Sequence, residues 1–351
     1  MLQTMRLLLL LLCFASFAQA QKTVSVGILS DKLISEPEDL VTAMKNEIKA
    51  VVGEDATLVF KTALENNFSK ERAVQNYQEL LKGNTDIILA FGVVNSIVLH
   101  QETSFPKPTI VFGTVNKDFI NLPVAQKTSG QNNITYLIAP MSYKEDLSVF
   151  KTLYDYKKLG IIVDEFLPKT LPVQELFASY FKDTENDFTL IPITETTNWE
   201  NELEGIDAVY LAGGFYLKEA ERSALINAIN AKKLPSFSAF GIRDVERGIL
   251  ATNQPDTNTE QFFRRIALSV EDIIAGKNPS ELPMYIDYKR KLSINFTTAS
   301  EIDFQVRYSM LGTVNFMGEA SITNSEVSLS IMDIMNGILN KNLALQVEKN
   351  L

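Results

Sequence analysis

Residues 86–92 read DIILAFG, an unbroken apolar run that ends in a glycine, and this stretch decides the fold class. A strand with one face in water alternates apolar and polar residues, whereas a strand covered on both faces is apolar throughout. The run therefore predicts a parallel strand with helices on both sides, followed by a turn. Such a strand belongs to a chain in which strands and helices alternate.

The alternation extends outward from this run in both directions. Apolar, β-branched runs predict further strands at residues 23–29, 56–61 and 109–113. Helical periodicity appears between them at 40–51, where Gly53 is a stop signal, and at 70–81. Strand and helix in this order predict a doubly wound parallel sheet with right-handed crossovers.

The pattern then starts again, which predicts a second unit of the same kind. Its strands are expected at 158–163, 188–193, 208–212 and 235–240, and its helices at 143–154, 173–181, 219–231 and 259–274. We expect an N-terminal α/β lobe over 21–138 and a C-terminal α/β lobe over 139–251. Residues 252–317 are expected to be a helix and a strand that return to the first lobe, and 318–351 a helical tail.

The first twenty residues have the pattern of a secretory signal peptide. Arg6 supplies a positive charge, an apolar run covers 7–17, and Ala18-Gln19-Ala20 has small residues at the cleavage positions. The run is shorter than the roughly 20 residues of a spanning helix. We expect cleavage after Ala20, loss of Cys13 with the peptide, and a periplasmic location.

Composition excludes several kinds of chemistry. The formal net charge is −10 without a basic cluster, which argues against nucleic acid as a partner. One cysteine and one histidine, His100, leave no thiolate or histidine-rich metal site, and no nucleotide-binding motif is present. Asp244 and Glu246 are expected to be solvated or paired with Arg243 and Arg247. We therefore predict no catalytic residues, no metal and no cofactor.

Ligands of open parallel sheets bind beyond the carboxyl ends of the strands. Small hydroxyl or amide residues, glycines and aromatics recur at these ends in both units, and they predict a pocket for a small molecule with a carboxylate and an apolar part. Glycine lets backbone approach a ligand, and the N–H groups near Ser96 could accept an anion. The candidate ligand-binding residues are Ser30, Asp31, Phe91, Gly92, Asn95, Ser96, Thr114, Asn116, Tyr136, Phe166, Gly213, Gly214, Phe215, Tyr216 and Phe240.

An ordered series of short motifs resembles a known family. It comprises LPSF at 234–237, DVERGILA at 244–251, IAGKNPSELP at 274–283 and SINFTTA at 293–299. In this order they resemble ABC-transporter substrate-binding proteins of the tryptophan/tyrosine-uptake type. The resemblance implies a type I periplasmic-binding fold, an amino-acid-like ligand held between two lobes, and a membrane permease as partner. The turn at 91–95 departs from the family pattern, which puts an aromatic amino acid as ligand in doubt.

Residues 327–346 form an amphipathic helical pattern that resembles the opening segment of outer-membrane efflux channel proteins. An ordinary docking helix would give the same pattern. The alternative function is therefore an accessory or sensory module beside an outer-membrane efflux channel, or a fragment of a fusion with one. A third possibility, an exported hydrolase, would need a convergent carboxylate pair in the cleft.

Overall fold

The computed structural model describes residues 21–32, 38–122, 126–194, 197–215, 217–255, 259–286, 288, 290–306 and 314–318. The expected signal peptide and the tail beyond Gly318 lie outside these residues, so the predictions for them stay predictions. Within the described part, no helix combines the length and the apolar character needed to cross a bilayer.

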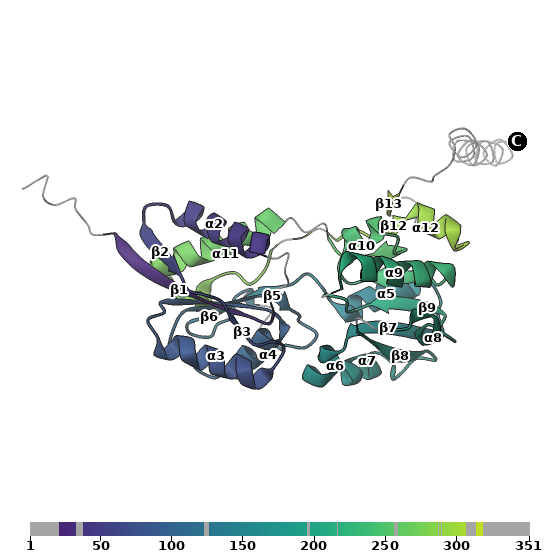
Figure 1. Ribbon diagram of the computed structural model, residues 1–351, viewed down its shortest axis with the longest axis horizontal. Helices are drawn as coiled ribbons and strands as arrows, with labels where there is room; N and C mark the ends of the chain where they lie inside the picture. Colours follow the sequence, from purple (N-terminus) through teal and green to yellow (C-terminus); the bar gives the residue numbers. More distant parts are fainter. Residues whose placement is uncertain are drawn as a thin grey trace, which may run out of the picture.

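The first lobe is built on a parallel sheet in the order β2-β1-β4-β5-β6, with β3 beside β1. Its strands are β1 (Lys22–Ser30), β2 (Ala56–Phe60), β3 (Leu64–Glu65), β4 (Ile87–Phe91), β5 (Thr109–Val115) and β6 (Ile134–Ile138). Its helices are α2 (Glu38–Val52), α3 (Lys70–Lys82), α4 (Val93–Gln101) and α11 (Thr259–Ile274). Helices α2 and α11 cover one face of the sheet, and α3 and α4 cover the other (Figure 1).

The central strand β4 shows why its sequence has no polar residue. Ile87 and Leu89 pack into the core beneath α2 and α11, whereas Ile88 and Ala90 pack into the core beneath α3 and α4. All four side chains are buried. Because successive side chains of a strand point to opposite faces, covering both faces with helices requires an unbroken apolar run.

The second lobe repeats this arrangement in a sheet of order β13-β12-β11-β10-β9-β7-β8. Its strands are β7 (Lys158–Asp164), β8 (Asp187–Ile193), β9 (Ala208–Leu211), β10 (Ser236–Ser238), β11 (Ala251–Thr252), β12 (Ser293–Asn295) and β13 (Asn315–Met317). Its helices are α5 (Tyr143–Leu153), α6 (Phe166–Thr170), α7 (Val173–Phe181), α8 (Trp199–Glu202), α9 (Glu219–Ala231), α10 (Ile242–Glu246) and α12 (Phe296–Glu301). The path β8-β7-β9-β10-β11 corresponds to β2-β1-β4-β5-β6, which confirms the predicted pair of doubly wound α/β lobes.

Three segments connect the lobes. They run from β6 to α5, from β11 to α11, and from the short 3-10 helix η2 (Pro279–Glu281) to β12. The side chain of Arg290, in the third segment, donates to the carbonyl oxygen of Pro140 in the first and pairs with Glu145 at 2.8 Å. Gln254, in the second segment, donates to Asp146 at 2.8 Å. These contacts bring the three connections together at the start of α5.

The prediction that residues 252–317 return to the first lobe is wrong in its second half. Helix α11 does pack in the first lobe, but β12 pairs antiparallel with β11 and parallel with β13 in the sheet of the second. Asn295 helps to hold β12 there, since its amide donates to the carbonyl oxygen of Val245. A strand of three residues carries no sequence signal for the sheet it joins.

Strands β3 and β6 and helix α4 of the first lobe were not predicted as such. Strand β6 ends at the expected lobe boundary between residues 138 and 139, and α4 follows the run at 86–92, where we predicted a turn. Helix α4 is buried over most of its surface, including Val93, Val94, Val98 and Leu99. A helix without a polar face shows little of the 3.6-residue periodicity by which helices are recognised.

Candidate ligand-binding site between the two lobes

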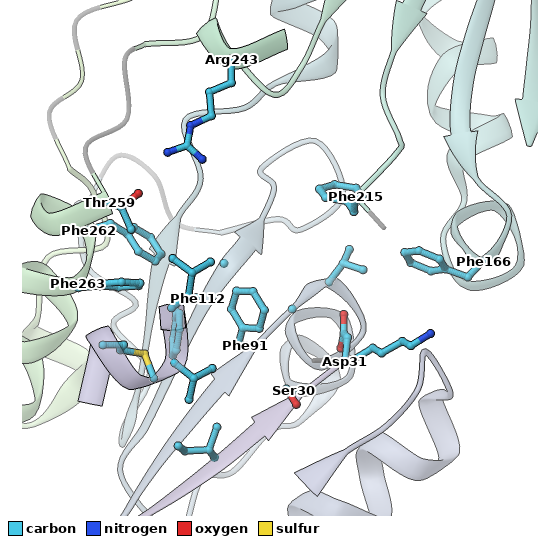
Figure 2. Close-up of a pocket in the computed structure, with 18 residues that line it drawn as sticks. Ser30, Asp31, Phe91, Phe112, Phe166, Phe215, Arg243, Thr259, Phe262 and Phe263 are labelled. Carbon is cyan, nitrogen blue, oxygen red and sulfur yellow. The ribbon is translucent and has the colours of Figure 1, made fainter. Parts of the chain in front are cut away.

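A cavity of about 430 Å³ lies at the carboxyl ends of β1, β4 and β5, where residues of the second lobe complete its wall. This volume is typical of a small-molecule site. Its lining residues are Ile28, Ser30, Asp31, Lys32, Leu40, Val41, Met44, Phe91, Gly92, Val93, Phe112, Gly113, Phe166, Phe215, Arg243, Thr259, Phe262 and Phe263. Figure 2 shows these side chains converging from both lobes.

The first lobe contributes an aromatic wall. Phe91 ends β4 and Phe112 lies beside it within β5, with their ring centroids 5.7 Å apart. The ring of Phe112 lies 6.2 Å from that of Phe262, in the first turns of α11, and Phe263 follows it (Figure 2). Phe91 is 36% exposed, which is high for a phenylalanine at the centre of a fold. Its exposed face is available to an apolar ligand.

Asp31 closes the base of this wall at the end of β1. Its buried carboxylate accepts hydrogen bonds from the backbone N–H of Val94 at 2.9 Å and of Asn95 at 3.2 Å, and from the side-chain amide of Asn66 at 2.9 Å. Burial raises the pKa of Asp31, and these hydrogen bonds offset part of that effect. A Cβ on Gly92, whose φ is +113°, would lie 2.4 Å from Cγ of Asp31. Glycine is therefore required at this turn.

Helix α4 begins at this turn, and its N-terminus is where we expected a ligand's anion. The carboxylate of Asp31 already accepts the first N–H groups of that helix. The Ser96 hydroxyl donates to the carbonyl oxygen of Val93 at 2.8 Å and is fully buried. The helix N-terminus is thus satisfied by the chain's own aspartate.

The second lobe also has an aspartate that accepts N–H groups from a glycine turn at its strand ends. Asp164, the last residue of β7, accepts hydrogen bonds from the N–H groups of Gly214 at 2.8 Å and Phe215 at 3.3 Å. Burial raises the pKa of this carboxyl group as well. A Cβ on Gly213 would lie 2.3 Å from the backbone nitrogen of Asp164, so this glycine permits the close approach of the two segments.

Two phenylalanines of the second lobe line the cavity. Phe215 follows the glycine turn, and its ring meets that of Phe240 edge-on, with the centroids 4.6 Å apart. Phe166 begins α6 and stacks on Phe68 of the first lobe, with the centroids 4.0 Å apart and the planes 16° from parallel. Phe166 therefore both lines the cavity and bridges the lobes.

Of the two expectations for Asp244, solvation is wrong and pairing with arginine is confirmed, although the closest partner is Arg222 and not Arg243. Asp244 is 2% exposed, accepts the Ser238 hydroxyl at 2.6 Å and pairs with Arg222 at 3.1 Å. Arg247 is a more distant partner at 3.7 Å. Arg222 also donates to the carbonyl oxygen of Gly214, which ties this network to the glycine turn.

Arg243 is not a partner of Asp244. Its side chain lines the cavity, and Figure 2 shows the guanidinium group pointing from α10 toward the aromatic wall. Among the described residues, no hydrogen-bond or ion-pair partner is found for it.

The structure brings together part of the predicted site. Residues that line the cavity are Ser30, Asp31, Phe91, Gly92, Phe166 and Phe215. Residues that lie behind the wall or build its turns are Asn95, Ser96, Gly213, Gly214 and Phe240. Asn116 and Tyr136 are buried outside the cavity lining, and Tyr136 belongs to the core on the α3 and α4 side of the first sheet. Thr114 lies in β5, and Tyr216 lies outside the described residues.

Sequence reasoning missed the helices that complete the wall. Leu40, Met44 and Phe262 lie on apolar helix faces whose periodicity we recognised as core-facing. The first turns of α2 and α11 reach the cavity at the carboxyl ends of the strands, so the same stripe serves the core and the cavity. Arg243 had no signal, because an arginine beside an aspartate is usually an ion pair.

The described part of the chain contains no cluster of three or more metal-ligating side chains that could hold an ion. His100, in the last turn of α4, packs its ring edge-on against Tyr136 with the centroids 6.4 Å apart. Burial lowers the pKa of this histidine.

Comparison with known proteins places the fold. No protein-family model and no curated protein matches the sequence. A conserved domain protein of Vibrio cholerae is similar in structure, with a TM-score of 0.62 and 17% identity over 85% of this chain and 100% of that chain. The ABC domain from Streptococcus pneumonia in complex with L-Trp gives a TM-score of 0.60 and 16% identity, over 84% of this chain and 99% of that chain.

A third similar structure is the ligand-free, open form of a substrate binding protein with adhesive properties from Clostridium difficile. It gives a TM-score of 0.54 and 15% identity over 84% of this chain and 99% of that chain. At these identities the likeness shows the fold, which is the two-lobed α/β architecture of type I periplasmic binding proteins.

Proposed function

We propose that this chain is an exported, non-catalytic solute-binding protein that captures a small organic molecule between its lobes and delivers it to the permease of an ABC-type transporter. The observation that carries the proposal is the cavity at the carboxyl ends of β1, β4 and β5, which side chains from both lobes complete. Ligands of open α/β sheets bind at this place. A ligand there contacts both lobes and therefore favours the arrangement in which they are close.

The cavity wall supports binding rather than chemistry. Six phenylalanines line it, four from the first lobe and two from the second. Of its polar groups, the Asp31 carboxylate is held by three donors from its own lobe. A general acid or base needs a group within reach of a substrate proton, and Asp31 faces its own backbone instead.

The delivery step and the periplasmic location rest on analogy. Two of the similar structures are described as an ABC domain with bound L-Trp and as a substrate binding protein. The secretory pattern at residues 1–20 supports export. The alternative role beside an outer-membrane efflux channel depends on the helix predicted at 327–346, which lies outside the described residues.

Thermal unfolding of the full chain, with amino acids, carboxylic acids, nucleosides and sugars added singly, tests the proposal. A ligand that binds the folded state alone stabilises it by about 2.7 kcal/mol at a hundredfold excess over its dissociation constant. We expect one chemical class to raise the unfolding midpoint saturably. The shift should be lost in Phe91→Ala and in Phe215→Ala, which change one wall residue of each lobe.

Phe316→Ala is the matched control, because Phe316 is 39% exposed on β13 and does not line the cavity. It should leave the ligand shift unchanged. A folded protein that no compound stabilises would contradict the proposal. So would a shift that survives both wall substitutions.

A further inference from the structure

We infer that the preferred ligand is a monocarboxylic acid with an aromatic or branched apolar body and without an amino group, rather than an α-amino acid. This inference rests on the proposed function, since it names the ligand class of the same cavity. It follows from the charged groups that face the cavity and from the partners they have within the chain.

The cationic groups that line the cavity are exposed and have no ion-pair partner among the described residues. Arg243 lines the cavity, and its guanidinium group has no ion-pair partner among the described residues. Lys32 also lines the cavity. A guanidinium group presents paired donors that match the two oxygens of a carboxylate. An acidic ligand whose apolar body lies against Phe91 and Phe262 would give Arg243 the partner that the described residues do not provide.

The carboxylates near the cavity, by contrast, accept hydrogen bonds or ion pairs from the chain itself. Asp31 accepts three hydrogen bonds from its own lobe, and Asp164 accepts two from the turn at Gly214. Asp244 is held by Arg222 and Ser238, and Glu165, beside Phe166, pairs with Lys169. Asp31 is the one carboxylate among the described residues that line the cavity.

An α-amino acid brings an ammonium group as well as a carboxylate. Burying an ammonium group away from water is costly unless an anion pairs with it. The hydroxyl of Ser30 lines the cavity and has no hydrogen-bond partner among the described residues; it could accept one hydrogen bond but carries no charge. The cavity therefore complements the carboxylate and the apolar body of a ligand and leaves an ammonium group uncompensated.

Isothermal titration of the full chain with three matched pairs tests the inference. The pairs are hydrocinnamate and L-phenylalanine, indolepropionate and L-tryptophan, and isocaproate and L-leucine. Within each pair the molecules differ only in the amino group. We expect the acid that fits the cavity best to bind about tenfold or more tightly than its amino acid, because the buried ammonium group has no anionic partner.

The role of Arg243 is tested separately with the tightest acid. Arg243→Gln should weaken its binding by about tenfold to a hundredfold, the usual contribution of a charge-assisted hydrogen bond. Binding of the corresponding alcohol should change little, and Arg243→Lys should retain part of the affinity. Arg264→Gln is the matched control, because Arg264 pairs with Glu47 outside the cavity lining.

The outcomes separate the two proposals. An amino acid that binds more tightly than its acid partner overturns the inference and leaves the solute-binding function standing. So does tight binding of sugars or nucleosides alone. An equal loss of affinity in Arg243→Gln and Arg264→Gln removes Arg243 from the site and overturns the inference as well. A folded protein that binds none of these compounds overturns the proposed function itself.

Discussion

Both lobes contain an aspartate that accepts backbone N–H groups at a glycine turn, but the surroundings of the two turns differ. In each lobe an aspartate at the end of the first strand accepts N–H groups next to a glycine turn. Asp31 accepts from Val94 and Asn95, just after Gly92. Asp164 accepts from Gly214 and Phe215. In a two-lobed receptor these turns are where a ligand's polar group would be expected. In this chain each turn is satisfied by an internal carboxylate.

The surroundings of the two turns are different. The turn at Gly92 is flanked by the aromatic wall of Phe91, Phe112 and Phe262, whereas the turn at Gly214 is tied to a buried ion pair between Arg222 and Asp244. The first lobe therefore provides most of the apolar surface of the cavity. The second provides Arg243, Phe166 and Phe215. The two turns are therefore alike, and the lobes differ in the surroundings of the turns.

The largest effect is expected from the ion pair that only the second lobe has. Arg222→Met should lower the free energy of unfolding by about 3–5 kcal/mol, because it leaves the buried Asp244 without its closest cation. Arg247→Met should cost less than about 1 kcal/mol, since Arg247 is a half-exposed partner at 3.7 Å. Urea unfolding of both variants measures the difference. Equal losses would show that Arg222 does not stabilise the second turn.

An alanine substitution should clash with backbone at one glycine turn and with a removable side chain at the other. Gly213→Ala places a Cβ against the backbone of Asp164 and should cost about 3 kcal/mol, at the upper end for overpacking. Gly92→Ala places its Cβ against the side chain of Asp31. Adding Asp31→Ala should therefore make the double variant less destabilised than the sum of the single variants, whereas adding Asp164→Ala to Gly213→Ala should not.

Gly205→Ala is the control for these unfolding measurements. Gly205 has a φ of +68° but nothing within 4 Å of its would-be Cβ, so the substitution should cost only about 1 kcal/mol of backbone strain. A loss as large as that of Gly213→Ala would mean that backbone conformation, and not close approach, requires the glycines. Additive double variants at Gly92 would contradict the difference between the lobes.

A smaller effect is expected where the lobes join. Burial raises the pKa of Asp146 from its ordinary 3.8 to about 7, although Tyr210, Gln254 and Arg290 lower it. Between these values the folded protein binds a proton that the unfolded chain has released, so stability falls as the pH rises from about 4 to about 7. The slope due to this group should be about 1 kcal/mol per pH unit.

Unfolding at pH 5, 6, 7 and 8 checks this slope in three proteins. Asp146→Asn should flatten it, leaving the contribution of Asp31 and Asp164, whose raised pKa values act in the same direction. Tyr210→Phe removes a hydroxyl that donates to Asp146 at 2.9 Å and should move the decline to higher pH. Parallel curves for the wild type and Asp146→Asn would show that this group ionises with its ordinary pKa.

The smallest effect is expected at the stack that bridges the lobes. Phe68→Ala removes the ring packed on Phe166 and should cost about 1 kcal/mol, beyond the area lost, in contact between the lobes. We expect a slightly larger radius of gyration by solution scattering and ligand affinity lower by about fivefold. Val74→Ala, on the exposed surface of α3, is the control. An unchanged radius and affinity would show that the stack does not set the distance between lobes.

The sequence was sufficient for the fold because its strands are covered on both faces. The run at 86–92 and its counterparts at 158–163 and 208–212 appear as β4, β7 and β9 in the expected order. Strand β6 and helix α4 were harder, because a helix buried on most sides and a strand at a lobe boundary lack a distinctive period. The three-residue strand β12 joins its sheet through tertiary contacts that no local pattern encodes.

The site was predictable only where it coincides with strand ends. Asp31, Phe91 and Phe215 were found because they follow apolar runs. Ser96 lies within α4 and Tyr136 within β6, and both side chains are buried in the protein. Phe262 and Arg243 come from helices, where the direction of a side chain relative to the cavity depends on the packing of whole elements. The packing of whole elements also decides that Asp244 pairs with Arg222 and Arg247 and not with Arg243.

The central claim is that a ligand is held between the lobes, and the distance across the cavity tests it most directly. Asn46→Cys on α2 and Glu246→Cys on α10 place spin labels on exposed positions of the two lobes, and replacing the single cysteine, Cys13, by serine prevents other labelling. With a saturating compound from the matched pairs, we predict that the label-to-label distance distribution narrows and its maximum shortens by more than about 2 Å. A distribution that stays unchanged while the same sample is shown to be saturated would contradict binding between the lobes.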